Sequence, residues 1–212
     1  MENVIRYGRE HFPLDLLPEE VLTSLGCGPE LPCRLAFLQS WGEAVQMLHR
    51  CSDPQAVAIR QEETLTVWLS LGAQLDETLC ACFQSGRFIL AYLLNTLADY
   101  MLFQMDELTV AMLRQELSHA GRFIGTRLEP SLDFALSAAH LTPVRSIVPE
   151  AALSAAGSLS PSKSMLFQLL LSPENCLSTG QHDCRRCSQT ACPYRGRRHP
   201  AFASTAPSPH HP

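Results

Sequence analysis

Four cysteines near the C-terminus form the densest group of potential metal ligands in the chain. Cys176, Cys184, Cys187 and Cys192 fall within 17 residues, and the middle two form a Cys-x-x-Cys pair. Thiolates at such spacing can converge on one metal ion or one cluster, because a short turn brings neighbouring cysteines to the same centre. The sequence therefore predicts a metal-binding, cysteine-rich knot over residues 173–195.

The ligands alone do not identify the metal. Pro193 directly follows the last cysteine, as in ferredoxin-type ligation, although the other spacings differ from that pattern. His182 lies between the cysteines and could replace one of them, while Arg185 and Arg186 would offset the negative charge of a thiolate site. Both an iron–sulfur cluster and zinc fit this set of ligands.

A second candidate site begins at Arg127, near the end of a predicted strand over 122–128. Glu129, Pro130 and Ser131 follow it. A guanidinium can bind a carboxylate through two parallel hydrogen bonds, which a lysine cannot reproduce. The alternative is an ordinary strand-end arginine that pairs with Glu129 or is solvated.

The only lysine of the chain, Lys163, precedes another predicted strand. It stands in the segment Pro161-Ser162-Lys163-Ser164. We interpret this segment as a loop that faces a ligand, with Lys163 and Ser164 as its binding residues. The alternative is a solvent-exposed turn.

Hydrophobic patterning predicts an α+β domain, with a helix-rich first half and a strand–loop–strand second half. Residues 64–71 are rich in β-branched and aromatic side chains, which is typical of a buried strand. The longest apolar helical pattern ends at Gly121, a residue type common just beyond helices. Helices are expected from Pro18, over 35–48, from Asp53, from Asp76 (as a cap) to about Gln84, and over 87–120, 133–139 and 143–148, and strands over 64–71, 122–128 and 165–171.

Composition and charge describe a globular chain with a basic C-terminal end. The 212 residues are 46% hydrophobic, which is enough to bury a core without disulfides. Residues 181–212 carry five arginines against Asp183, a net of +4, so the total of −5 leaves −9 on the other 180 residues. No aromatic-rich binding motif accompanies these arginines, and we expect no nucleic-acid partner. Residues 196–212 are expected to be a disordered tail of Pro, Ser, Ala and His.

We expect a cytoplasmic protein without a membrane span. Residues 1–20 lack the apolar stretch of a signal peptide. Residues 88–105 include several polar side chains and fall short of a span of about 20 apolar residues, so a buried helix fits better. Nine cysteines without an export signal are expected to be thiols and metal ligands. The five outside the knot are predicted to be small buried side chains.

Three separated segments share motifs with one known family. Residues 3–8 (Asn-Val-Ile-Arg-Tyr-Gly) are similar to its opening Arg-Tyr-Leu-Gly, and residues 126–130 (Thr-Arg-Leu-Glu-Pro) stand where it reads Arg-x-x-Pro-Gly. Residues 153–164 end in Pro-Ser-Lys-Ser, similar to its Pro-x-Lys-Ser, with Lys163 in register. Over about residues 1–195 the chain resembles the stand-alone activation domain of vitamin B12-dependent methionine synthase from anaerobic bacteria.

The resemblance implies an activation-domain-like fold over residues 1–172, helix-rich with a small, mainly antiparallel twisted sheet. It also implies an accessory subunit of cobalamin-dependent methionine synthase or of a related corrinoid methyltransferase, which is not catalytic alone. Such a subunit binds S-adenosylmethionine and supports reductive methylation of the corrinoid. Its partners would be a corrinoid-binding methyltransferase protein, which carries the cobalamin, and an electron donor. Because this chemistry needs low-potential electrons, it favours an iron–sulfur cluster over zinc.

The resemblance also implies residue roles. Arg127 matches the family arginine that holds the carboxylate of S-adenosylmethionine, and Lys163 and Ser164 match its loop facing the corrinoid or the nucleoside. Two departures are that Ser131 replaces the family glycine and Leu132 the neighbouring aromatic residue.

A third departure is that the family's acidic residue on the long helix falls near Phe103, with Asp99 and Glu107 one turn to either side. The departures leave an alternative function: an iron–sulfur or zinc protein for interaction or electron delivery, built on the same scaffold with a decayed S-adenosylmethionine site.

Overall fold

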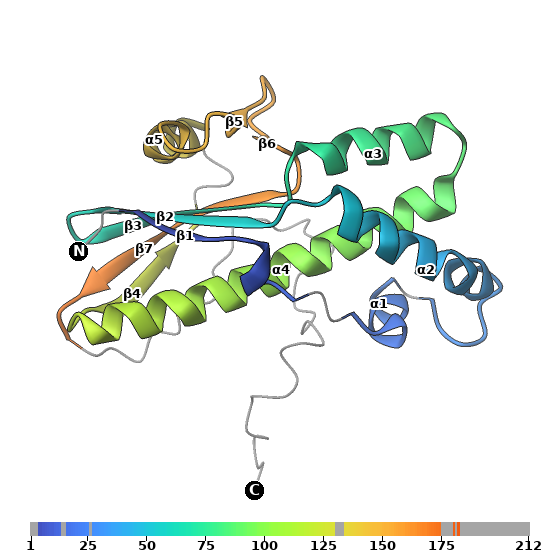
Figure 1. The fold of residues 1–212 in the computed structure, drawn as a ribbon, viewed down its shortest axis with the longest axis horizontal. Coiled ribbons are helices and arrows are strands. Elements are labelled where there is room, and N and C mark those ends of the chain that lie inside the picture. Colours follow the sequence, from blue (N-terminus) through green and yellow to red (C-terminus); the bar gives the residue numbers. More distant parts are fainter. Residues whose placement is uncertain are drawn as a thin grey trace, which may run out of the picture.

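A β-hairpin lies inside the sheet. β2 (Gln55–Gln61) and β3 (Thr64–Ser70) pair across a turn in which Glu62 adopts a φ of 54°. The sheet contains three further strands, β1 (Val4–Tyr7), β4 (Phe123–Leu128) and β7 (Ser164–Ser172). The order is β1-β2-β3-β7-β4, and each neighbouring pair is antiparallel (Figure 1). The computed structural model describes residues 4–13, 16–25, 27–129, 134–174, 180 and 182.

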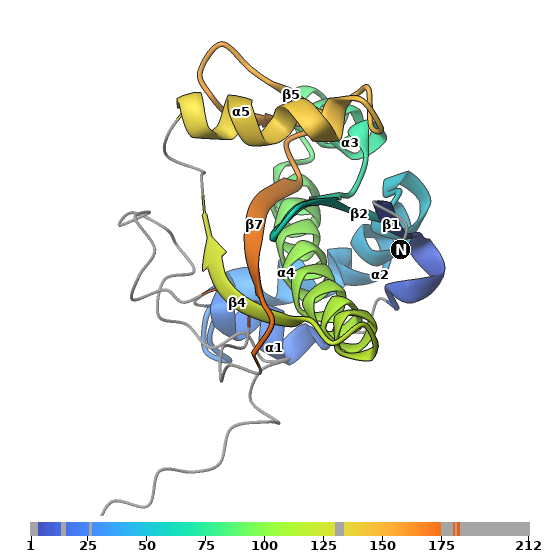
Figure 2. The same cartoon turned by 90° about the vertical axis from the view of Figure 1, so that its left-hand side faces the viewer.

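Helices cover both faces of this sheet. The elements outside it are η1 (Arg9–His11), α1 (Pro18–Ser24), α2 (Cys33–Cys51), α3 (Ala73–Gln84), α4 (Phe88–His119), α5 (Phe134–Arg145) and a small ladder of β5 (Ala152–Leu153) and β6 (Leu159–Ser160). The long helix α4 runs along one face, and α5 lies on the other (Figures 1 and 2).

The alternation of side chains along the strands explains these two layers. Successive residues of a strand point to opposite faces, so each strand can supply two cores. In β2, Ala56 and Ala58 join the larger core with α4, whereas Val57 and Ile59 join the smaller core with α5. β3 divides in the same way, since Val67 packs on the α4 side and its neighbour Trp68 on the other side.

The helix α4 is the main support of the larger core. Most of its buried residues are leucines and methionines. By length and composition α4 could cross a membrane, but 61% of its apolar 18-residue stretch is buried inside the protein. A core helix of a soluble protein passes the same test, and α4 lies in the larger core of this fold.

Most of the predicted elements are present with boundaries shifted by a few residues. The strand predicted over 165–171 is β7, and the helix predicted over 87–120 is α4. The helix predicted from Asp53 is wrong, because β2 occupies that segment. Its run Ala-Val-Ala-Ile is apolar on both sides, as a strand between two helical layers requires.

Three smaller predictions are also wrong. Residues 133–139 and 143–148 do not form two helices, because α5 continues through Pro143 and ends at Arg145. Pro143 lacks a backbone N–H, but so close to the end of the helix the lost hydrogen bond matters little. Asp76 does not cap α3, whose N-cap is Gly72. Of the five cysteines predicted to be buried, Cys33 and Cys80 are exposed.

Candidate functional site

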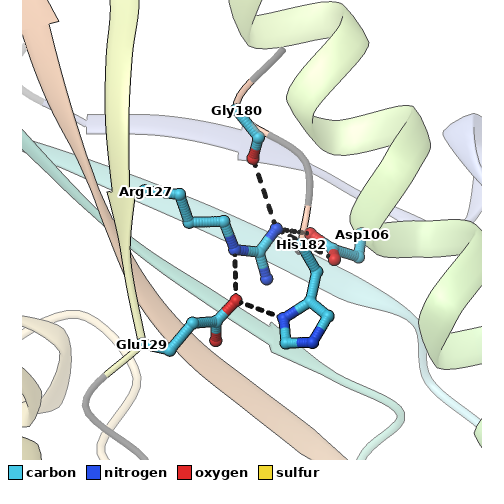
Figure 3. A network of polar contacts seen from close by, with 5 residues as sticks. All are labelled: Asp106, Arg127, Glu129, Gly180 and His182. Atoms are coloured by element: carbon cyan, nitrogen blue, oxygen red, sulfur yellow. Dashed lines mark hydrogen bonds and ion pairs between the residues drawn. The ribbon is translucent and has the colours of Figure 1, made fainter. Parts of the chain in front are cut away.

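A buried ion-pair network joins α4 to the edge strand β4 (Figure 3). Arg127 of β4 donates from Nη1 to both carboxylate oxygens of Asp106 on α4, at 2.7 and 2.9 Å. Its Nε donates to Glu129 Oε1 at 2.6 Å. Only 6% of the Arg127 side chain and 9% of the Asp106 side chain are exposed. Removing two charges from water is costly, and their attraction offsets that cost only when the two groups are close and well aligned.

A β-bulge turns Arg127 toward α4. The register of β4 against β7 shifts between Ile124 and Arg127. In a regular strand, residues three positions apart face opposite sides, yet Ile124 is part of the core against α4 and Arg127 also faces that helix. Gly125 lies in the bulge, where an added Cβ would come within 3.1 Å of the Leu170 carbonyl oxygen.

The neighbouring strand supplies an aromatic surface for the guanidinium. The Arg127 Cζ lies 3.7 Å from the centroid of the Phe167 ring, and Phe167 itself is fully buried. This arrangement is a cation–π contact in a desolvated environment, where such contacts are strongest. The guanidinium is therefore fixed by a ring and by two carboxylates.

Two residues beyond the end of β7 also contact this network. The Gly180 carbonyl oxygen accepts a long hydrogen bond of 3.5 Å from Arg127 Nη1. The His182 Nδ1 lies 2.7 Å from Glu129 Oε1 (Figure 3). Gly180 has a φ of 67°, and an added Cβ would lie 2.8 Å from Ile124 Cγ2 and 3.1 Å from Val110 Cγ1. Only glycine fits this position without displacing its neighbours.

The pKa directions follow from burial and from these partners. Burial raises the pKa of Asp106, and the adjacent Arg127 opposes that rise. For Glu129, burial favours the neutral form, but the hydrogen bond from His182 and the charge of Arg127 outweigh it, so the pKa of Glu129 falls below its ordinary value. Burial and the charge of Asp106 raise the pKa of Glu107, the next residue on α4, to about 7.

The second candidate segment is tied to the same face of α4. Lys163 forms an ion pair with Asp99, and both side chains are mostly buried. Asp99 and Asp106 are seven residues apart, or about 10 Å along the helix axis at 1.5 Å per residue. The alternative of a solvent-exposed turn is therefore wrong for Lys163.

The serines on either side of Lys163 have structural partners. Ser162 donates through its backbone N–H and its hydroxyl to Asp76 of α3. The Ser164 hydroxyl donates to that of Ser70 on β3 at 3.0 Å, and Ser164 is buried. Ser164 therefore holds β7 against β3, and its ligand-binding role stays a prediction.

Comparison with known proteins gives a structural match and no sequence match. No family model matches the sequence, and no curated protein matches it. The crystal structure of the MetH reactivation domain bound to AdoHcy superposes with a TM-score of 0.52 at 10% identity, over 84% of this chain and 81% of the other. The chain shares the fold of the MetH reactivation domain.

This match confirms the α+β prediction with an antiparallel sheet. At 10% identity it shows the fold alone, so the residue roles rest on the geometry of this chain. In this chain the structure brings Arg127 and Glu129 together with Asp106 and His182. Lys163 pairs with Asp99, two turns along α4 from Asp106.

Several predicted site residues lie outside the residues that the structure describes. They are Pro130, Ser131, Cys176, Cys184, Cys187 and Cys192. The described residues contain no group of three or more His, Cys, Asp or Glu side chains that could hold a metal ion. The cysteine-rich metal site therefore stays a prediction.

Sequence reasoning missed Asp106. The acidic partner was expected near Phe103, with Asp99 and Glu107 as its neighbours. A signal was present, because Leu102, Val110 and Leu113 lie four positions before and four and seven positions after Asp106, on the same buried face. A carboxylate on an apolar helix face requires a cation from another element.

Proposed function

We propose that this protein is an activation component for cobalamin-dependent methionine synthase or a related corrinoid methyltransferase, and that it binds S-adenosylmethionine at Arg127. One observation carries this proposal: a buried guanidinium, oriented by Asp106 and Phe167, stands in a MetH reactivation fold at the position where the sequence resembles the carboxylate-binding arginine. The structural neighbour was solved with AdoHcy, which has the same amino-acid end as S-adenosylmethionine.

The charge of the network suits this ligand. Asp106 and Glu129 carry two negative charges and Arg127 one positive charge, so the network holds one excess negative charge when His182 is neutral. S-adenosylmethionine has a carboxylate, an ammonium and a sulfonium, with a net charge of +1. We place its carboxylate at Arg127 and its ammonium near Glu129.

Lys163 supports a position for the rest of the ligand. Its ion pair with Asp99 lies on the same face of α4 as the Arg127 pair, about 10 Å along the axis. We therefore propose that the adenosyl end extends toward Lys163, and that the methyl group is presented to a corrinoid held by a partner protein. The cofactor supplies the methyl and redox chemistry, while the protein supplies position and charge.

The C-terminal segment has a proposed electron-delivery role. Cys176, Cys184, Cys187 and Cys192 would bind an iron–sulfur cluster or zinc, and an iron–sulfur cluster fits the need for low-potential electrons. His182, which contacts Glu129, lies two residues before Cys184 in the chain. We propose a cytoplasmic protein whose partners are a corrinoid protein and an electron donor.

One observation favours a second function on the same scaffold. The Arg127 guanidinium is already engaged by Asp106, Glu129 and the Gly180 carbonyl. A ligand carboxylate would have to displace at least one of these contacts. Ser131 adds a side chain where the family has a glycine, and Leu132 lacks the ring of the family's aromatic residue. The second candidate is thus a metal-bearing interaction or electron-delivery protein without S-adenosylmethionine binding.

Calorimetry with S-adenosylmethionine separates the two functions. Arg127→Ala should weaken binding by ~1.5–3 kcal/mol, the usual value for a hydrogen bond to a charged group. That loss corresponds to roughly ten- to 150-fold in affinity. Arg127→Lys should also weaken binding, because lysine lacks the planar fork, and it avoids leaving Asp106 without a cation.

The matched control is Arg122→Lys, which alters a partly exposed arginine paired with Glu63 just before β4 and should leave the affinity unchanged. Decarboxylated S-adenosylmethionine should bind weakly to wild type and lose little more with Arg127→Lys, because both changes remove one contact. Ser131→Gly should tighten binding if the side chain obstructs the site. If neither wild type nor Ser131→Gly binds at millimolar ligand, the activation function is wrong and the second candidate is favoured.

A further inference from the structure

Two free thiols face each other where α1 is joined to α2. The Sγ atoms of Cys27 and Cys33 are 3.6 Å apart. Cys33 is the first residue of α2 and is exposed, whereas Cys27 is 6% exposed and lies in the main core. One thiol is thus open to reagents in solution and the other is within its reach from below the surface.

Backbone hydrogen bonds and one arginine hold this pair in place. The Cys27 N–H donates to the Leu22 carbonyl at 2.9 Å, which fixes the cysteine to the end of α1. Arg34 donates from Nη1 to the Cys27 carbonyl at 2.9 Å and from Nη2 to the carboxylate of Glu19 on α1. Arg34 also directly follows Cys33 in the chain, so it connects both thiol-bearing segments.

The remaining described cysteines have different surroundings. The Cys51 thiol donates to the Met47 carbonyl within its own helix at 2.7 Å. Cys80 accepts from Gln84 at 3.3 Å and is exposed, while Cys82 is buried. Residues two apart on a helix do not face each other, so Cys80 and Cys82 form a natural control for an adjacent but separated pair.

We propose that Cys27 and Cys33 are a redox-active dithiol, which closes to a disulfide by exchange with a low-molecular-weight disulfide such as oxidised glutathione. The Cys33 thiolate attacks one sulfur of the reagent and releases one thiol. The Cys27 thiol then loses its proton to solvent, and its sulfur attacks Cys33 Sγ to release the second thiol. Two protein thiols are oxidised, and one reagent disulfide is reduced to two thiols.

The geometry sets the order of attack. Only Cys33 is accessible to a reagent before any structural change, and Cys27 then acts from within the core. Burial, together with the neighbouring Cys33, raises the pKa of the Cys27 thiol, so it stays protonated until the mixed disulfide is beside it. Closing the bond requires the sulfurs to approach by about 1.6 Å, since a disulfide measures about 2.05 Å.

Oxidation would tie α1 to α2 covalently. The segment between the two cysteines is Gly28-Pro29-Glu30-Leu31-Pro32, and α1 packs against both α2 and α4. Disulfides in reducing compartments are usually transient and redox-sensing, which fits a pair with one exposed member. This inference does not depend on S-adenosylmethionine binding.

Tryptic mapping tests the pair within the full chain. Cleavage after Arg9 and Arg34 gives a peptide over 10–34 with both Cys27 and Cys33, and cleavage after Arg60 and Arg87 gives a peptide over 61–87 with Cys80 and Cys82. The protein is equilibrated in glutathione redox buffers, quenched in acid, alkylated and digested. The 10–34 peptide should lose two hydrogen masses and resist alkylation at an oxidised glutathione fraction at least about tenfold below that needed for 61–87.

Two variants test the order of attack. Cys27→Ser should accumulate a glutathione adduct on Cys33, because the second thiol is missing, whereas Cys33→Ser should leave Cys27 unmodified in the native protein. Cys80→Ser should not change oxidation of the 10–34 peptide. The proposal is overturned if both peptides oxidise together, if wild type only accumulates glutathione adducts on 10–34, or if Cys33→Ser is modified at Cys27 as fast as wild type is at Cys33.

Discussion

Asp99 and Asp106 lie two turns apart on one face of α4, and each binds a basic side chain from the sheet or its border. Asp99 pairs with Lys163 just before β7, and Asp106 pairs with Arg127 of β4. Residues seven apart on a helix share a face, so the two pairs are aligned along it. The helix thus fixes the spacing between the two basic groups that we assign to the ligand.

Replacing the acid of the deeper pair should be costly. Asp106→Asn removes the carboxylate whose two oxygens accept from Arg127 Nη1, and breaking a buried pair from one side typically costs about 3–5 kcal/mol. Asp99→Asn should cost less, because its side chain is 19% exposed compared with 9% for Asp106. Denaturant unfolding followed by circular dichroism measures both losses.

An uncharged triple replacement supplies the control for that experiment. Asp106→Leu combined with Arg127→Met and Glu129→Gln removes the three charges of the network and keeps similar volume, which is often neutral for a buried ion pair or triad. A triple variant that is as unstable as Asp106→Asn would contradict the view that the unpaired charge causes the loss.

The free energy of unfolding at acidic pH should depend on Glu129. Its pKa is below the ordinary value of about 4.3 for glutamate, so it stabilises the fold above that pH. This contribution is lost as the pH falls through the lower, folded-state pKa. Glu129→Gln should therefore be less stable than wild type at pH 7, on the order of 1 kcal/mol, the difference between charged and neutral hydrogen bonds.

The same variant should show a flatter decline in stability below about pH 4.5. Other charged groups that face Glu129 are Arg127, His182 and Asp106, and they are unchanged in this variant. Glu63→Gln is the matched control, because Glu63 is 58% exposed and its pair with Arg122 should contribute little. An identical pH profile for Glu129→Gln and wild type would rule out this role.

The fold was more predictable from the sequence than the site. Apolar patterns that extend over many residues located α4 and β3, because a buried helix and a buried strand each keep an apolar signal along their length. β2 was missed because its apolar run has no alternation between water and core. The orientation of Arg127 depends on a bulge in β4 and on Asp106 from another element, and neither relationship is local in sequence.

The metal site should be separable from the domain that precedes it. Cys184→Ser with Cys187→Ser should abolish metal binding, measured as metal content and visible absorbance after anaerobic purification. The main thermal transition should change little, because the described residues of α4 and the sheet form a large core among themselves. Cys80→Ser is the control and should retain the metal. A double variant that fails to fold would show that the segment is structural and would weaken the electron-delivery proposal.

Gly180→Ala should release the C-terminal segment from the Arg127 network. The added methyl would meet Ile124 Cγ2 at 2.8 Å and Val110 Cγ1 at 3.1 Å, and the φ of 67° is itself strained for alanine, at a cost of about 1–2 kcal/mol. Gly42→Ala is the control, since nothing lies within 4 Å of its added Cβ in the middle of α2 and it should be neutral or stabilising. The Gly180 carbonyl and His182 would compete with a ligand for Arg127 and Glu129. Gly180→Ala should therefore bind S-adenosylmethionine more tightly than wild type, while Gly42→Ala should not. Hydrogen exchange at the amides of β4 should rise in Gly180→Ala and stay unchanged in Gly42→Ala. Unchanged exchange together with unchanged affinity would mean that the contacts of Gly180 and His182 do not restrict access to Arg127.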